Sequence, residues 1–296
     1  GPAAFQQQVG EMFRKEWRLQ NGKGTPATVA ILDDDPRAQP LYPEFRLAQA
    51  QLRAAGLEAL VADPRDLTIV GDALMLGGVR VDIVYNRLVD FLLEQPTHGV
   101  LRQAYERGLV AVTPNPHIYS RLADKQNLTL LSDPDSLRSW GLAAEPAAVL
   151  AAAVPRTILV RPENAAELWA DRRNWFFKPA RGHASKAAYR GDKLTRRVWE
   201  EIRNATYVAQ TYAAPGERRI PPAAEPVSLK VDVRLYTYGG RMLLAAARLY
   251  QGQTTNMRTP GGGFAPVLVL PAAVADIDEC PGAVTPSPGA ACHDRS

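Results

Sequence analysis

The stretch from Trp175 to Gly191 constrains the chain most, because it joins a predicted strand to a flexible basic loop. It reads Trp-Phe-Phe-Lys-Pro-Ala-Arg-Gly-His-Ala-Ser-Lys-Ala-Ala-Tyr-Arg-Gly. The aromatic start is typical of a strand, and Lys178 stands at its end, directly before the loop. Backbone N–H groups of such a loop can surround a polyphosphate while lysine side chains neutralise its charge. The stretch therefore predicts a phosphate-binding loop, with a basic surface hairpin as the alternative.

Four residues of this stretch are candidate ligands of the anion. They are Lys178 at the strand end and Gly182, Ser185 and Lys186 in the loop. The arrangement differs from a Walker loop, because the sequence Gly-x-x-x-x-Gly-Lys-Ser/Thr occurs nowhere in the chain. Any phosphate site here is therefore of another kind.

The composition is that of a globular protein large enough for two domains with cores of their own or for one large α/β unit. The chain has 296 residues, of which 46% are hydrophobic and 22% charged. Its formal charge is +4, from 35 basic and 31 acidic residues, and no long run of lysine or arginine is present. This mild excess argues against a nucleic-acid partner.

The ends of the chain give few indications of targeting. Neither a signal peptide nor an apolar run of membrane-spanning length is present, so we expect a cytoplasmic protein without a membrane partner. Cys280 and Cys292 lie in a tail rich in Pro, Gly and Ala, which indicates neither a disulfide framework nor a zinc site. The opening Gly1-Pro2 is typical of residues left after tag cleavage, so we expect the natural chain to begin upstream.

The first half alternates apolar, strand-like runs with segments of helical period. This alternation predicts a parallel, doubly wound α/β domain over residues 25–155, preceded by a helix within residues 1–24. The alanine-rich segment 143–154 fits either a helix or a linker. The expected strands are 28–32, 57–62, 79–85 and 109–113, and the expected helices are 5–19, 41–55, 96–105 and 118–131.

The composition changes near Arg156, and the following residues predict a smaller α+β domain over 156–270. Gly239-Gly240 between two long strand-like runs is a strong hairpin signal. Residues 271–296 lack periodicity and are expected to be disordered. The expected strands are 175–178, 207–212, 228–238 and 241–250, with a helix over 193–202 and a turn at Pro215-Gly216.

Several features occur in an order that resembles the ATP-grasp superfamily. Lys178-Pro179 with its glycine loop resembles the phosphate-grasping hairpin, and Tyr207-Val-Ala-Gln210 resembles the hinge strand whose backbone meets adenine. Asp124-Lys125 resembles the lysine that precedes the lid. The resemblance implies a doubly wound pre-ATP-grasp domain followed by an ATP-grasp α+β domain. A further set of residues resembles the run found in carboxylate–amine ligases of this superfamily. It consists of Asp232-Val-Arg234, Arg248, Asn256 and glycines 261–263.

Within that superfamily, the chain is most similar to the circularly permuted ATP-grasp proteins, a bacterial group related to glutathione and glutathionylspermidine synthetase-like ligases. The likeness extends from about Glu11 to Val267. Its landmarks are Tyr42-Pro-Glu-Phe45, Val61-Ala-Asp-Pro64, Val81-Asp-Ile-Val-Tyr-Asn-Arg87, Ala123-Asp-Lys125 and Gly191-Asp-Lys-Leu-Thr-Arg-Arg-Val-Trp-Glu-Glu201.

The resemblance implies ATP and Mg²⁺ as cofactors. Lys178 would neutralise the α- and β-phosphates, and Lys125 could reach them from the first domain. The candidate catalytic residues are Arg248, whose planar fork suits the γ-phosphoryl group, and Arg234, which could hold an acceptor carboxylate. Lys125 could instead form an ordinary ion pair on a helix surface, and Arg248 could lie along an apolar strand with its charge in water. The implied cofactor-binding residues are Lys125, Lys178, Gly182, Ser185, Lys186, Gln210, Lys230 and Asn256.

The metal site is the point at which the resemblance fails. The chain lacks the Glu-x-Asn sequence with which this superfamily usually holds Mg²⁺. Either that segment lies upstream of Gly1 in the natural chain, as in circularly permuted members, or the protein lacks it and does not catalyse. Asp232 is the metal candidate of the second domain. Asp33-Asp34-Asp35 could bind a hard cation, but we favour a turn before Pro36.

The predicted function is ATP-dependent ligation of a small carboxylate to a small amine or similar nucleophile, through an acylphosphate. The alternative is a non-catalytic nucleotide-binding or scaffold protein with the same fold. A nucleic-acid-binding function rests only on the basic charge. The sequence identifies neither the acid, nor the amine, nor the oligomeric state.

Overall fold

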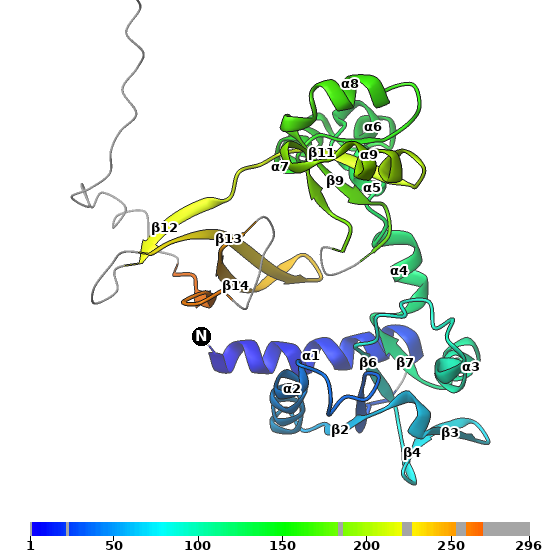
Figure 1. The fold of residues 1–296 in the computed structure, drawn as a ribbon. Helices are drawn as coiled ribbons and strands as arrows, with labels where there is room; N and C mark the ends of the chain where they lie inside the picture. The colour runs from blue at the N-terminus through cyan, green and yellow to red at the C-terminus, as the bar shows by residue number, and fades with distance from the viewer. Residues whose placement is uncertain (1, 22–23, 183–185, 221–226, 253–258, 269–296) are drawn as a thin grey trace, which may run out of the picture.

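The computed structural model describes residues 2–21, 24–182, 186–220, 227–252 and 259–268. Its first lobe is built on a parallel sheet of β1 (Thr28–Leu32), β2 (Glu58–Ala62), β6 (Ile83–Asn86) and β7 (Ala111–Thr113) (Figure 1). The strand order is β2-β1-β6-β7. All five residues of β1 are buried, as expected for a parallel strand covered on both faces.

Helices cover both faces of this sheet. On one face, α1 (Pro2–Asn21) and α2 (Tyr42–Ala54) contribute Phe13, Phe45 and Leu52 to the core. On the other face, α3 (Gly99–Glu106) packs beside a small antiparallel sheet of β3 (Leu67–Val70), β4 (Ala73–Leu76) and β5 (Val79–Arg80). The expected doubly wound layer is therefore present, while the small sheet was not predicted.

The strand expected over 79–85 is wrong as a single element. β5 ends at Arg80 and belongs to the small sheet, whereas β6 begins at Ile83 in the parallel sheet. Between them, the Asp82 carboxylate accepts hydrogen bonds from the backbone N–H groups of Ala27 and Thr28, at 2.7 and 3.1 Å. This side-chain anchor fixes the chain at the point where it passes from one sheet to the other.

The helix expected over 118–131 is also wrong as a single element. It is interrupted between α4 (Pro116–Leu122) and α5 (Asn127–Leu131). The Asp124 carboxylate accepts the backbone N–H of Gln126 at 2.9 Å, a local bond that competes with helix hydrogen bonding. The segment 143–154, which by sequence fits a helix or a linker, is a helix, α7 (Ala144–Ala153), and α6 (Pro134–Ser139) precedes it.

A second, antiparallel sheet carries the phosphate-loop candidate. It has the order β10-β9-β11-β8, from β8 (Thr157–Leu159), β9 (Trp175–Pro179), β10 (Tyr189–Arg190) and β11 (Tyr207–Thr211). Helices α8 (Ala165–Ala170) and α9 (Arg196–Arg203) pack on one face, where Phe177, Trp199 and Ile202 form the core. Because side chains alternate along a strand, Lys178 and Gln210 lie on the opposite face.

The third sheet contains the predicted hairpin. It has the order β12-β13-β14-β15, from β12 (Gly216–Ile220), β13 (Val227–Tyr238), β14 (Arg241–Tyr250) and β15 (Gly263–Pro266). The hairpin turn is confirmed: Gly239 and Gly240 have φ of 56° and 76°, as the favoured two-residue turn requires. The turn expected at Pro215-Gly216 is wrong, because Gly216 already pairs with Val231 as the first residue of β12.

Short 3-10 helices complete the described elements: Pro64–Asp66, Pro96–His98, Arg172–Asn174 and Gly191–Lys193. Among the described helices, none is long and apolar enough to cross a membrane. The tail expected to be disordered, residues 271–296, lies outside the described residues.

Helix α1 contacts the tip of the β13–β14 hairpin. The Tyr238 hydroxyl donates to Glu16 Oε1 at 2.7 Å, and Lys15 Nζ lies 5.4 Å from the centre of the Tyr238 ring. Tyr238→Phe is expected to lower the unfolding free energy by about 1 kcal/mol, the usual net value of one such bond. Urea unfolding measures this loss. Tyr236→Phe is the control, and an equal effect of both substitutions would contradict the assignment.

Candidate functional site

Lys178 is held by a chain of side-chain hydrogen bonds across the second sheet. Its Nζ donates to Gln210 Oε1 at 2.7 Å, and Gln210 Nε2 donates to Thr157 Oγ1 at 3.0 Å. The three residues come from β9, β11 and β8, which are neighbours in the sheet. Gln210 and Thr157 are buried, so the amide is fixed and orients the lysine.

Lys125 approaches the same loop from the segment between α4 and α5. Its backbone N–H donates to Ala180 O at 2.9 Å, and its Nζ donates to Gly182 O at 3.2 Å. Gly182 has a φ of 143°, which favours glycine at this position. The structure therefore brings Lys125, from a separate segment, next to Lys178 and Gly182, which the sequence analysis placed in one loop.

The two ammonium groups repel each other. Burial lowers the pKa of Lys178, and the nearby charge of Lys125 lowers it further. Burial also lowers the pKa of Lys125, with Asp124 opposing it in part. Within the described part of the chain, no carboxylate forms an ion pair with either ammonium. Two partly buried, mutually repelling cations without a bonded carboxylate make a site that an anion would stabilise.

The other predicted site residues lie on the third sheet. Arg248 and Asp232 face each other across β13 and β14, with Nε–Oδ1 and Nη2–Oδ2 distances of 2.6 and 3.0 Å. The Arg248 guanidinium thus already neutralises Asp232, the predicted metal ligand. Lys230 Nζ donates to the Gly252 carbonyl, and Arg234 is exposed, 5.8 Å from the centre of the Tyr236 ring.

Three further predictions concern the loops. Lys186 is described and exposed. Ser185 and Asn256 lie outside the described residues. The structure therefore groups part of the predicted set around Lys178 and places Lys230, Asp232, Arg234 and Arg248 on a different sheet.

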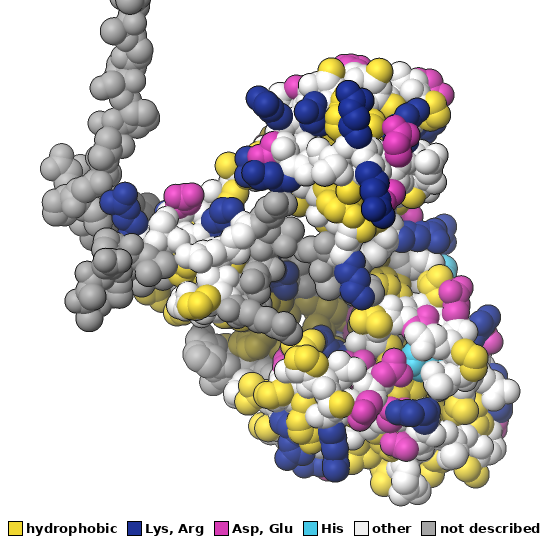
Figure 2. Space-filling view, in the orientation of Figure 1, with side chains coloured by type: hydrophobic (Ala, Val, Ile, Leu, Met, Phe, Trp, Pro, Cys, Tyr) yellow, Lys and Arg dark blue, Asp and Glu magenta, His cyan; other side chains and the backbone are white. Residues whose placement is uncertain are grey.

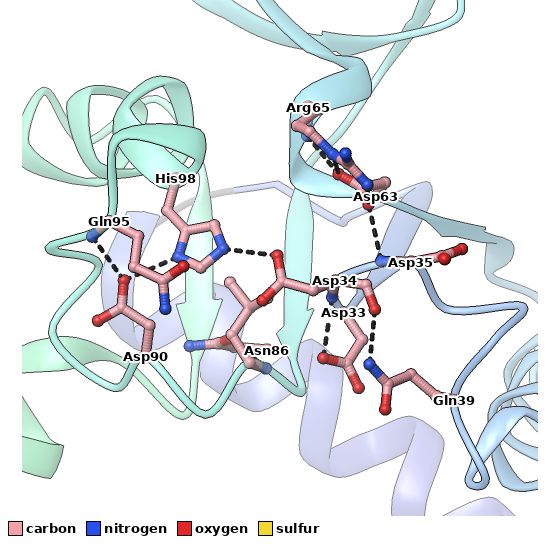
Figure 3. A network of polar contacts seen from close by, with 11 residues as sticks. Asp33, Asp34, Asp35, Gln39, Asp63, Arg65, Asn86, Asp90, Gln95 and His98 are labelled. Carbon is pink, nitrogen blue, oxygen red and sulfur yellow. Dashed lines mark hydrogen bonds and ion pairs between the residues drawn. The ribbon is translucent and has the colours of Figure 1, made fainter.

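A polar network that the sequence did not reveal lies in the first lobe (Figure 3). His98 is fully buried, with Nε2 2.8 Å from Asp34 Oδ1 and Nδ1 2.8 Å from Asp90 Oδ2. Burial alone would lower the pKa of His98, but the two carboxylates outweigh it and raise the pKa above its usual value. The ring therefore favours the protonated form, in which both nitrogens donate.

The three aspartates that follow β1, Asp33 to Asp35, form the start of a turn. This is the structure that the sequence favours for them, with a cation site as the alternative. The Ala38 N–H donates to Asp35 O at 3.0 Å, which closes the turn. Burial raises the pKa of Asp33. In the part of the chain that is described, no group of three or more His, Cys, Asp or Glu side chains is placed to hold a metal ion.

This region is the carboxyl edge of the parallel sheet. Asp33, Asp63 and Asn86 follow or end β1, β2 and β6, and the next two strands of this sheet in sequence, β2 and β6, lie on opposite sides of β1. Such a switch point is where α/β sheets commonly bind ligands. On the face shown in Figure 2, acidic side chains and a histidine gather on the lobe that carries this sheet.

A cavity of about 590 Å³ lies along β8, at the edge of the sheet that carries Lys178. Neither lysine lines it, but two of its lining residues link it to the pair: Gln126 follows Lys125, and Thr157 bonds to Gln210, the hydrogen-bond partner of Lys178. Its volume is within the range of about 300–1,000 Å³ typical of small-molecule pockets. Its other polar lining includes Ser132, Asp133, Arg156, Arg161 and Asn164.

Comparison with known proteins gives a likeness in fold. No protein-family model matches the chain, and no curated protein sequence does. A solved structure of a putative γ-glutamylcysteine synthetase from Methylobacillus flagellatus KT is similar, with a TM-score of 0.54 and 10% identity over 91% of this chain and 73% of that chain. At this identity the likeness concerns the fold alone.

Two further solved structures are similar at lower TM-scores. A glutathione synthetase-like effector (GSS30) from Globodera pallida has a TM-score of 0.47 and 14% identity, over 83% of this chain and 54% of that chain. The present chain thus spans about half the length of that effector. The ATP-grasp ligase PsnB, complexed with the precursor peptide PsnA2 and AMPPNP, has a TM-score of 0.43 and 17% identity, over 82% and 76% of the two chains.

Proposed function

We propose that the chain binds ATP and acts as an ATP-grasp ligase, joining a small carboxylate to an amine or similar nucleophile. The observation that carries the proposal is the convergence of Lys125 and Lys178, two partly buried ammonium groups that repel each other. In the proposal they hold the phosphates of ATP, with the backbone of the loop at Gly182 beside them.

The cavity of about 590 Å³ is the proposed place for the nucleoside. Gln126 and Thr157 line it; Gln126 follows Lys125 in sequence, and Thr157 is joined to Lys178 through Gln210. A nucleoside there would leave its phosphates directed toward Lys125 and Lys178. The sequence landmarks shared with circularly permuted ATP-grasp proteins support placing the chain in that group.

Mg²⁺ is part of the family expectation, but the described residues do not provide a fitting site for it. Both oxygens of Asp232 already bond to Arg248, and no carboxylate cluster suited to a metal is present in the described ranges. We therefore assign no step to protein-bound metal.

The proposed reaction has two steps. A carboxylate oxygen bonds to the γ-phosphorus, the bond from that phosphorus to the β–γ bridging oxygen breaks, and ADP leaves. The amine nitrogen then bonds to the acyl carbon, the bond from that carbon to the phosphate oxygen breaks, and the nitrogen loses a proton. Lys125 and Lys178 would stabilise the charge that develops on ADP, and Arg248 and Arg234 are the proposed contacts of the phosphoryl group and the carboxylate.

Hydroxylamine trapping tests the proposal. An acylphosphate reacts with hydroxylamine to give a hydroxamate, so the chain incubated with ATP, Mg²⁺ and a panel of amino acids and dipeptides should yield ATP-dependent hydroxamate and ADP in equal amounts. At an ATP concentration near the wild-type Kd, Lys178→Met should lower both about tenfold or more. ATP binding with no hydroxamate from any panel member would instead favour the non-catalytic alternative.

A further inference from the structure

A second cavity, of about 260 Å³, lies between the first lobe and the loop that follows β9. Its walls come from three segments that are distant in sequence: 89–94, 119–124 and 181–182. We call it the Tyr119 cavity. It adjoins the lysine pair, because Gly182 lines the cavity and its carbonyl accepts the hydrogen bond of Lys125 Nζ at 3.2 Å.

One wall of the Tyr119 cavity is aromatic and apolar. Phe91 and Tyr119 stack with ring centroids 3.9 Å apart and an interplanar angle of 11°. Val89, Leu92 and Ala123 extend this wall. The volume falls just below the range of about 300–1,000 Å³ that accommodates drug-sized ligands, so the cavity fits a molecule the size of an amino acid.

The polar wall carries an excess of negative charge. It contains three carboxylates, Asp90, Glu94 and Asp124, and one cation, Arg181. Burial alone would raise the pKa of Asp124, but the Gln126 N–H and the Arg181 guanidinium outweigh it and lower that pKa. Burial likewise opposes ionisation of Asp90, but the Gln95 N–H and His98 lower its pKa overall. Both carboxylates are therefore ionised at neutral pH.

Glu94 is the carboxylate left for a ligand. Asp124 is bound to Arg181 at 3.1 Å, and Asp90 is bound to His98 at 2.8 Å. The Glu94 side chain is exposed and, among the described residues, makes no hydrogen bond or ion pair, although Arg102 attracts it from beyond ion-pair distance. A cationic ligand would pair with it, whereas an anionic ligand would meet three carboxylates.

We propose that the Tyr119 cavity binds the nucleophile of the ligation, a small primary amine that binds with its ammonium group at Glu94 and an apolar group against Phe91 and Tyr119. The ammonium gives up one proton to water before the free amine attacks the acyl carbon. This inference rests on the proposed ligase function, since the position of the cavity beside the lysine pair gives the amine its role. The cavity, its apolar wall and its charge excess together define the ligand class.

L-Leucinamide is the probe, because it combines one positive charge with an apolar side chain. Its binding is measured by calorimetry, with and without a non-hydrolysable ATP analogue and Mg²⁺. Neutral N-acetyl-L-leucinamide has the same apolar group and reports the contribution of the charge. The expected result is saturable binding of L-leucinamide and at least threefold weaker binding of its acetylated form.

Two substitutions locate the bound amine. Ala123→Leu fills the cavity from an exposed position and is expected to weaken binding about tenfold, while Leu122→Ala on the neighbouring exposed side chain should have no effect. Glu94→Gln is expected to weaken binding about threefold to fivefold, and Glu163→Gln, an exposed glutamate outside the cavity, should not. Thermal unfolding verifies that each variant is folded.

Several results would overturn the inference: no saturable binding in either condition, equal binding of both probes, or unchanged binding to Ala123→Leu. Titration of ATP into the same samples separates this failure from failure of the proposed function. ATP binding without amine binding would reject only the Tyr119 cavity as the amine site. Amine binding in a chain that does not bind ATP would reject the role of the Tyr119 cavity as the nucleophile site of a ligation.

Discussion

Lys178→Met is expected to weaken ATP binding about 10- to 150-fold, which corresponds to the usual 1.5–3 kcal/mol for hydrogen bonds to a charged group. The reason is that Lys178 is one of two ammonium groups at the proposed phosphate site, and its orientation is fixed by Gln210 at 2.7 Å. Methionine retains much of the apolar length of the side chain and removes the charge. Calorimetric titration with ATP measures the change.

If Lys178 had a purely structural role, its substitution would lower the stability of the fold. The unfolding free energy therefore distinguishes a structural role from a phosphate-binding role. Burial and Lys125 lower the pKa of Lys178 in the folded chain, so the charged form is less favourable folded than unfolded. That cost is present at neutral pH, diminishes as pH rises from the lowered folded pKa toward the usual lysine pKa of about 10.4, and is absent above it. Lys178→Met should therefore change the unfolding free energy by no more than about 1 kcal/mol, since loss of the Gln210 bond offsets the relief.

Lys193→Met is the matched control, because Lys193 is exposed, follows β10 in the same sheet as Lys178, and lies outside the site. It should leave both ATP affinity and stability unchanged. Equal weakening of ATP binding by the two substitutions would indicate a general effect of charge, and a large loss of stability on Lys178→Met would indicate a structural role.

His98→Leu is expected to lower the unfolding free energy by about 3–5 kcal/mol, the range for removal of one partner from a buried ion pair. His98 is fully buried between two carboxylates, and the side chain of Asp90 is only 9% exposed. Removal of the imidazolium leaves Asp90 buried with only its backbone partners. Urea unfolding measures the loss.

A second variant separates charge from packing. Because replacement of a whole buried ion pair by uncharged residues is often nearly neutral, Asp90→Asn added to His98→Leu should recover part of the lost stability. If the double variant is less stable than His98→Leu alone, the loss came from packing and the electrostatic account is wrong.

The contribution of His98 should depend on pH with a defined sign. Its folded pKa is raised above the usual value of about 6.5, so its stabilisation is complete below that value and is lost as pH rises through the raised pKa. The stability difference between wild type and His98→Leu should therefore be greater at about pH 6 than at about pH 9. A difference that is constant or grows with pH would contradict a protonated His98.

The parts of the fold that could be predicted depend on local patterns. β1 is a run of five buried residues, and the β13–β14 hairpin has Gly239-Gly240 between two long strands. Elements such as β8 and β10 have three and two residues, too few for a periodic pattern to be recognised. The break at Asp124 depends on one side-chain bond that the apolar period does not report.

The candidate site also has parts that local sequence predicts and parts that it does not. Lys178 and the loop that follows it could be predicted from residue type, because a strand ending on lysine before a glycine loop is a local signal. The network of His98 could not, since Asp34 lies 64 positions and Asp90 8 positions from it. The bond of Arg248 to Asp232 depends on the β13–β14 register, which places the two residues directly opposite each other.

Proton uptake on ATP binding tests the central claim most directly. A lysine whose pKa is lowered by burial and by a neighbouring cation should regain a proton when phosphate charge arrives beside it. Calorimetric titrations at about pH 9, below the usual lysine pKa of about 10.4, should be made in buffers of different ionisation enthalpy. We expect saturable ATP binding with proton uptake that is lost in Lys178→Met. Absence of saturable ATP binding, or the same uptake in Lys178→Met, would contradict a phosphate site at this lysine.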